Sequence, residues 1–169
     1  MNPLLLAISY FFHLVATIVW IGGLALLVLV VWPVAGQVLK DDPARLAAFL
    51  GALRKRFDPL ANLSLVVLVV TGMIQTGGDP NYGGLLVFDN DWSRAILLKH
   101  IAIAGMVAAG IVLQLGVAPA LERMALLRAA GEDDPAETAR LLRRERRLNT
   151  LNLALGLLVL AFTAVATAL

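Results

Sequence analysis

The sequence predicts an all-α integral membrane protein, an antiparallel bundle of four transmembrane helices with a short interfacial helix in its first loop. Of its 169 residues, 60% are hydrophobic and only 15% are charged, which is unlike the usage of a soluble globular domain. Four apolar spans cover roughly residues 4–32, 59–77, 93–118 and 148–168, and each reaches about the 20 residues that a membrane-crossing helix needs. Helices are expected because backbone polar groups in lipid must bond internally. The length suits one domain, residues 1–169.

The first span holds the strongest candidate site residues. No Lys, Arg, Asp or Glu precedes Lys40, yet His13 lies well inside the span. An ionisable side chain in lipid is costly and normally faces the bundle interior, so His13 indicates a site. Trp20 follows two helical turns later and is expected on the same face. Gly22 and Gly23 remove side chains where a neighbouring helix or a flat ligand could approach closely.

The first loop predicts the short interfacial helix. Asp42 is a plausible N-cap, and Pro43 occupies the first helical position. An apolar stripe follows at helical spacing and ends at a basic cluster; it comprises Leu46, Phe49, Leu50 and Leu53.

The basic residues predict the orientation. The loop between the first two spans holds five Lys or Arg residues, the last loop holds seven, and the acidic middle loop holds none before Arg94. The positive-inside rule then places the first and third loops in the cytoplasm. We therefore expect a multi-pass protein of the cell membrane with both termini outside. The net charge of +2 is small, and the basic residues flank apolar spans. No nucleic-acid partner is therefore expected.

The two histidines of the chain are expected at similar depth. His13 lies about 9 residues into the first span and His100 about 7 residues into the third, or roughly 14 and 10 Å of helix rise. The two spans run in the same direction, so both imidazoles fall in the outer half of the membrane. Bundle interiors are a usual place for cofactors held by facing helices.

Haem b between the first and third spans is the favoured cofactor, with His13 and His100 as axial ligands. Arg94 and Lys99 lie where they would pair with the propionates. Lys99 is also read as a snorkelling side chain, as a ligand in place of His100, or as a proton relay. The function expected is electron transfer or redox sensing with a redox partner or another membrane subunit. In the alternative interpretation, each histidine only bonds a neighbouring helix or a buried water.

Copper is the competing metal, since Met sulfur and imidazole together suit Cu(I). Met73 and Met106 are the candidate sulfur ligands, although methionines are common core filler. The chain has no Cys, which excludes thiolate metal sites and iron–sulfur clusters. No nucleophile–base pair, phosphate loop or carboxylate dyad is recognisable, so enzymatic activity stays open. Interhelical hydrogen bonds are expected from the polar residues of the spans, which are Asn62, Gln75, Gln114, Asn149 and Asn152.

The chain resembles the copper-resistance protein D (CopD-like) membrane domain. The resemblance covers most of the chain and lies in His13 with Trp20-Ile21-Gly22-Gly23 and Pro33, in Phe57 with Leu60-Ala61 and Thr71-Gly72, in Arg94 with Leu97-Leu98-Lys99, and in Gly156-Leu157-Leu158-Val159-Leu160 after an Arg-rich run. It implies a role in copper uptake or tolerance. The pattern of His13, Trp20 and Lys99 is also similar to the more distant HemJ-type protoporphyrinogen oxidases, which bind haem b. The basic and aromatic stretch expected there after Trp20 is missing.

Overall fold

Four long helices dominate the part of the chain that the structure describes. The computed structural model describes residues 2–84, 87 and 89–169. Within these residues, four continuous helices are long and apolar enough to cross a membrane: Pro3–Val38, Pro43–Gly78, Asp91–Ala129 and Pro135–Ala168. The predicted all-α membrane fold with four spanning helices is therefore confirmed.

The first and third of these long helices are interrupted by π-helical turns. The first runs through α1 (Pro3–Thr17), η1 (Ile18–Gly22), α2 (Gly23–Leu26), η2 (Leu27–Val31) and α3 (Trp32–Val38). The second is a single helix, α4 (Pro43–Gly78). The third runs through α5 (Asp91–Val112), η3 (Leu113–Val117) and α6 (Ala118–Ala129), and the last is α7 (Pro135–Ala168).

Proline accounts for two of the three π-helical turns. A proline within a helix lacks an N–H, and its ring clashes with the carbonyl four residues earlier. For Pro33 that carbonyl belongs to Leu29 in η2, and for Pro119 it belongs to Leu115 in η3. A π turn relieves such a clash by widening the helix locally.

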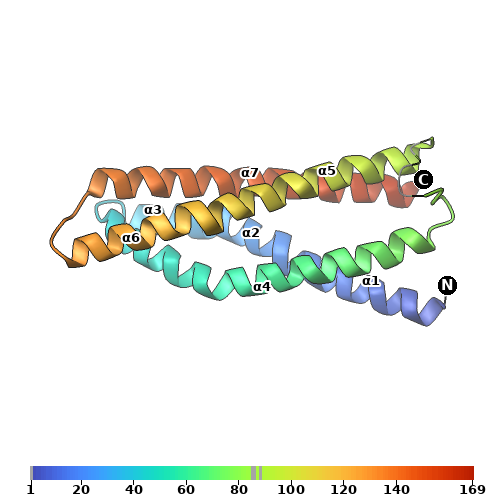
Figure 1. Ribbon diagram of the computed structural model, residues 1–169, viewed down its shortest axis with the longest axis horizontal. Coiled ribbons are helices and arrows are strands. Elements are labelled where there is room, and N and C mark those ends of the chain that lie inside the picture. The colour runs from blue at the N-terminus through green and yellow to red at the C-terminus, as the bar shows by residue number, and fades with distance from the viewer. Residues whose placement is uncertain (1, 85–86, 88) are drawn as a thin grey trace.

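The interfacial helix expected in the first loop is not a separate element. It forms the first half of α4, which begins with Asp42 accepting a hydrogen bond from the Arg45 backbone N–H at 2.9 Å and continues to Gly78. Pro59 lies inside this helix, and Figure 1 shows that α4 is bent along its length. The helix continues because a proline can be accommodated by a bend when packing holds both halves.

The helices pack as two antiparallel pairs. The first pair is α1 with α4, and the second is α5 with α7. Figure 1 shows α5 and α7 running together above α4 and α1, with both chain termini at the same end. Towards the opposite end, α4 also packs on α6 and α7, so the two pairs join there.

Small residues allow the second pair to pack closely. The α5 face against α7 carries buried Ala95, Ala102, Met106 and Ala109. Met106 lies against Gly156 of α7, whose missing Cβ would sit 3.4 Å from the methionine methyl group. Close helix approach through small residues is typical of packing within lipid.

The opposite end of the bundle holds a cluster of larger side chains, and much of the remaining surface is apolar. The cluster comprises Trp32, Leu50, Val117, Leu121, Leu141 and Leu142. Long apolar side chains such as Leu4, Ile18 and Leu115 are exposed along the helices. A soluble monomer rarely exposes such surface, so we assign it to contact with the hydrocarbon of the bilayer.

Candidate functional site

His13 is held against α4 by Thr71. Its Nδ1 lies 2.8 Å from Thr71 Oγ1. The Thr71 hydroxyl has only one hydrogen, and it donates that hydrogen to the Val67 carbonyl oxygen at 2.6 Å. With its hydrogen directed to Val67, Oγ1 accepts a hydrogen bond from the imidazole when Nδ1 carries the proton. This hydrogen bond leaves the lone pair of Nε2 free to bind a metal.

Further polar contacts secure α1 on α4 beside this histidine. The buried Ser9 hydroxyl donates to the Thr71 carbonyl oxygen at 3.2 Å, and the Gln75 amide donates to Ser9 Oγ at 3.5 Å. Gly72 of α4 lies beside the imidazole, since a Cβ there would stand in ordinary contact with His13 Cε1 at 3.7 Å. The interhelical role expected for Gln75 is confirmed, and His13 has a fixed orientation.

His100 has the same tautomer for a different reason. Its Nδ1 lies 2.7 Å from the Ile96 carbonyl oxygen of its own helix. A carbonyl can only accept, so Nδ1 carries the proton and Nε2 again keeps its lone pair. His100 lies on the same side of its helix as Val107 and Gln114, at heptad spacing. The Gln114 amide donates to Asn62 Oδ1 of α4 at 3.1 Å. The interhelical hydrogen bond expected of Asn62 and of Gln114 is therefore confirmed.

The structure places the two histidines on different helix pairs. His13 belongs to the pair of α1 and α4, whereas His100 belongs to the pair of α5 and α7. Lys99 precedes His100 on α5, the helix that packs against α7. Lys99 is half-buried and follows Ala95 by one helical turn. Its charge therefore acts towards the interior of the bundle.

The remaining residues expected around a cofactor have other partners. Arg94 is exposed and pairs with Asp91 on its own helix at 3.1 Å. The Phe57 ring of α4 fills the space next to the Gly23 Cα, so a Cβ added at Gly23 would overlap the ring. Gly22 is nearly open, with only Ile18 Cγ2 4.0 Å from its Cβ position. Gly23 thus allows Phe57 to pack against the first helix, whereas Gly22 has no such neighbour.

The two methionines considered as copper ligands differ in their exposure. Met73 is 71% exposed on the surface that faces lipid, whereas Met106 is 1% exposed and packed against Gly156. Within residues 2–84, 87 and 89–169, no group of three or more His, Cys, Asp or Glu side chains forms a metal site. The two methionines therefore lie in different environments, one on the lipid-facing surface and one in the packed interior.

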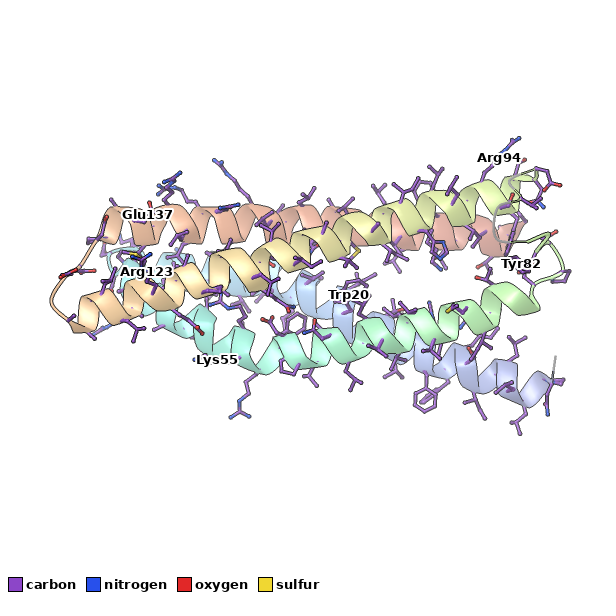
Figure 2. The ribbon with its side chains drawn as sticks, in the orientation of Figure 1. Trp20, Lys55, Tyr82, Arg94, Arg123 and Glu137 are labelled. Atoms are coloured by element: carbon purple, nitrogen blue, oxygen red, sulfur yellow. The ribbon has the colours of Figure 1, made fainter. Side chains whose placement is uncertain are left out.

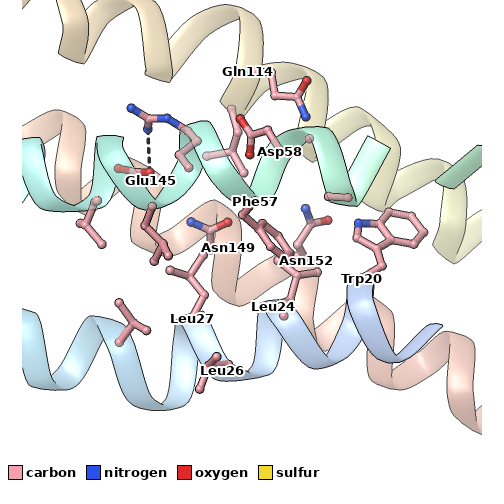
Figure 3. A pocket seen from close by; sticks show the side chains of 18 residues that line it. Trp20, Leu24, Leu26, Leu27, Phe57, Asp58, Gln114, Glu145, Asn149 and Asn152 are labelled. Atoms are coloured by element: carbon pink, nitrogen blue, oxygen red, sulfur yellow. Dashed lines mark hydrogen bonds and ion pairs between the residues drawn. The ribbon is translucent and has the colours of Figure 1, made fainter. Parts of the chain in front are cut away.

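Trp20 lines a pocket that does not include His13 and that contains a cluster of charged side chains. This cluster was not predicted from the sequence. We call this pocket the Arg54 pocket; it measures about 150 Å³. Figure 3 shows Glu145, Asn149 and Asn152 in succession along α7, with Phe57, Asp58 and Trp20 around them. The guanidinium of Arg54 donates to Glu145 Oε1 at 2.8 Å and joins α4 to α7.

All three π-helical turns border this pocket. Trp20 comes from η1, Leu27 and Val31 from η2, and Leu113 and Gln114 from η3. Figure 2 shows Trp20 near the middle of the molecule, between the end with Lys55 and Arg123 and the end with Arg94. Wide helical turns of this kind often occur at functional sites. Trp20 and His13 therefore belong to different places along the bundle.

Spacing in the sequence could have revealed the Arg54 pocket. Glu145, Asn149 and Asn152 follow each other at intervals of four and three residues, which is one face of a helix. Arg54 and Asp58 are likewise four apart. The arginines around Glu145 indicate the cytoplasmic side of the membrane and draw attention away from the single carboxylate among them. The sequence also predicts a break between the interfacial helix and the second span, which separates Arg54 from the membrane helices.

The comparisons with known proteins identify one family. A family model described as copper resistance protein D matches residues 51–166, which includes α5 and most of α4 and α7. Neither a curated protein nor a solved structure gives a significant match, and the expected likeness to HemJ-type oxidases is not shown. The family description names copper and gives no support to haem b. His13, Trp20 and the glycine pair precede the matched residues, so their part of the resemblance is not tested. The chain belongs to the copper resistance protein D family of multi-pass membrane proteins.

Proposed function

We propose that this protein handles copper at the membrane and that the copper ion is its cargo. Membership of the copper resistance protein D family supports the choice of metal. The four apolar helices place the chain in a bilayer, where uptake into the cell or tolerance of copper requires a membrane step. The proposal replaces electron transfer through haem as the favoured function.

His13 and His100 are the copper ligands in this proposal. The observation that carries it is the hydrogen bond at Nδ1 of each ring, to Thr71 Oγ1 or to the Ile96 carbonyl oxygen, which leaves Nε2 as the nitrogen available to a metal. Metal-binding histidines commonly donate the other N–H to such an acceptor, which orients the ring. Imidazole nitrogen is a suitable copper ligand.

Copper binding to the purified protein tests this assignment. We expect the wild type in detergent to bind copper in competition with a chelator, and His13→Ala and His100→Ala each to weaken the affinity. An absorption spectrum of the same preparation tests the haem interpretation, because bis-imidazole haem would give a Soret band. A wild type that binds no copper, or alanine variants with unchanged affinity, would contradict the proposed ligands.

The threonine that orients His13 provides a finer test. Thr71→Val removes the acceptor of the Nδ1 proton, and loss of such an outer partner costs roughly 10–100-fold in metal affinity. Thr163→Val is the matched control, because the Thr163 hydroxyl donates only to the Val159 carbonyl of its own helix at 2.7 Å. Equal copper affinities for the two variants would show that Thr71 does not act on a ligand.

The cellular role is tested by copper flux. Vesicles reconstituted with the wild type should accumulate radioactive copper faster than vesicles with His13→Ala. Cells producing the two proteins in equal amounts should differ in the copper concentration at which growth stops. If the wild type binds copper tightly and moves none, the protein retains copper at the membrane.

A further inference from the structure

We propose that the Arg54 pocket is a proton-binding site, at which Glu145 takes up and releases a proton as copper crosses the membrane. The coupling to copper rests on the function proposed above, whereas proton binding by Glu145 is a separate property. The pocket lies apart from the histidines: along α4, Asp58 is about 20 Å of helix rise from Thr71.

The pocket lacks one positive charge. Arg54 and Glu145 form an ion pair whose side chains are only 13% and 6% exposed. Asp58 lines the same pocket and adds a second carboxylate for the single guanidinium. Asp58 is half-buried and Glu145 is buried. A buried carboxylate that shares its only cation is costly to keep ionised, and uptake of one proton removes that cost. The lining residues thus carry a formal charge of −1, which one proton neutralises.

Two buried acceptor atoms also lack hydrogen-bond donors. Glu145 Oε2 and Asn152 Oδ1 have no partner in the described structure, and both residues line the pocket and are more than nine-tenths buried. A buried acceptor without a donor destabilises the fold. Protonation turns Glu145 Oε2 into a donor. A pocket of about 150 Å³ also has room for a few water molecules at roughly 30 Å³ each, which can carry the proton and bond to Asn152.

The chemistry of the pocket suits a proton better than a metal ion. The guanidinium stays charged and lies 2.8 Å from Glu145 Oε1, so it would repel a metal ion bound to that carboxylate. The remaining polar ligands are carboxylate and amide oxygens, which favour hard ions such as Mg²⁺ over copper. A proton binds to one oxygen and needs no further ligand.

Arg54 can respond to this proton by changing its partner. Arg54 and Asp58 are four residues apart on α4, so their side chains can meet on one helix face. When Glu145 is ionised, the guanidinium bonds across to α7. When Glu145 is neutral, the guanidinium is attracted more strongly to Asp58. Protonation would then weaken the link between α4 and α7 in the part of α4 that precedes Pro59.

Few other ionisable groups compete for this role. The sequences of α2, η2 and η3, which pack against α7 here, contain no titratable side chain. On α6, Glu122 pairs with Lys55 at 3.6 Å and Arg128 pairs with Asp42 and Asp133. Arg123 of α6 lines a different, exposed pocket near the loop before α7. Arg54 and Asp58 are thus the charged groups that face Glu145 from packed helices.

Vesicles containing a pH-sensitive dye test the coupling. Addition of copper to wild-type vesicles should change the internal pH, and for one proton per copper ion a difference of one pH unit should shift copper accumulation about tenfold. Glu145→Gln, which resembles the protonated side chain, should abolish the proton flux. The matched control is Glu122→Gln, which makes the same change on an exposed carboxylate and should behave as the wild type.

Infrared difference spectra of the purified protein test proton binding without copper transport. A pH change should produce a carboxylic-acid C=O band that is lost in Glu145→Gln and kept in Glu122→Gln. An unchanged band in Glu145→Gln would overturn the proposal. So would copper flux without proton flux in the wild type, which leaves the copper function intact. If the vesicles move no copper, the coupling of proton binding to copper transport fails, and the infrared band alone decides whether Glu145 binds a proton.

Discussion

Replacing Arg54 by Met should destabilise the protein through the charge left on Glu145. The two side chains are 13% and 6% exposed and bonded at 2.8 Å. Removing one member of a buried ion pair costs about 3–5 kcal/mol, mainly because the other charge remains buried and unpaired. Asp58 lines the same pocket and increases the penalty, since two carboxylates would then face each other without a cation. We therefore expect Arg54→Met to lie at the upper end of this range.

The double variant Arg54→Met with Glu145→Met separates the loss of a contact from the burial of a charge. An apolar pair of similar volume is often as stable as the buried ion pair that it replaces. Unfolding of the detergent-solubilised protein by heat or by SDS measures all three stabilities. The double variant should recover most of what Arg54→Met loses. Low pH should also reduce the penalty of Arg54→Met, because protonation of Glu145 removes the unpaired charge.

A small effect of Arg54→Met would refute this reasoning. If its stability at neutral pH lies within about 1 kcal/mol of the wild type, the pair contributes no more than an exposed ion pair does. If the double variant is as unstable as Arg54→Met, the loss reflects packing of the arginine stem and not an unpaired carboxylate. Either result would also weaken the case for a charge deficit in the Arg54 pocket.

Three other changes have defined outcomes. Gly23→Ala should cost about 1–3 kcal/mol in thermal unfolding, because its Cβ would overlap the Phe57 ring; Gly22→Ala, whose Cβ meets only Ile18 at 4.0 Å, should be close to neutral, and equal effects would contradict this account. Asp42→Ala should cost about 1 kcal/mol by removing the cap bond to the Arg45 N–H, with the neighbouring Asp41→Ala as control. A C-terminal reporter that is active only in the cytoplasm should be silent, because the basic loops are expected inside; strong activity would reverse the orientation.

Hydrophobic length and helix-capping chemistry were sufficient to predict the main elements. The four apolar spans correspond to the four long helices, and Asp42 with Pro43 begins α4 as expected. The extent of α4 was predicted less well because the basic cluster and Pro59 resemble the end of a helix. The segment stays helical because Leu50 is buried in the cluster with Trp32 and Leu121. Such contacts between distant residues cannot be read from local sequence.

The candidate site residues differ in how visible they are in the sequence, and their role as ligands stays a prediction. His13 stood out because a lone ionisable residue in an apolar span is conspicuous, and its bond to Thr71 joins two helices. Glu145 did not stand out, since it is surrounded by arginines that are abundant near a membrane surface. Only the fold shows that Glu145 of α7 contacts Arg54 of the neighbouring helix α4. Arg144 and Arg146, next to Glu145 in the sequence, are exposed.

The position of α4 connects the histidine region with the Arg54 pocket. Thr71 orients His13 at one end of this helix, and Arg54 and Asp58 contribute charges to the pocket nearer the other end. Pro59 lies between them, and a proline bend is a place where a helix can change its angle without losing further hydrogen bonds. A change in the partner of Arg54 would alter how the first half of α4 is held on α7. The second half of α4 carries Thr71, so under the two proposals copper at His13 and a proton at Glu145 would influence each other through the angle between the two halves of α4.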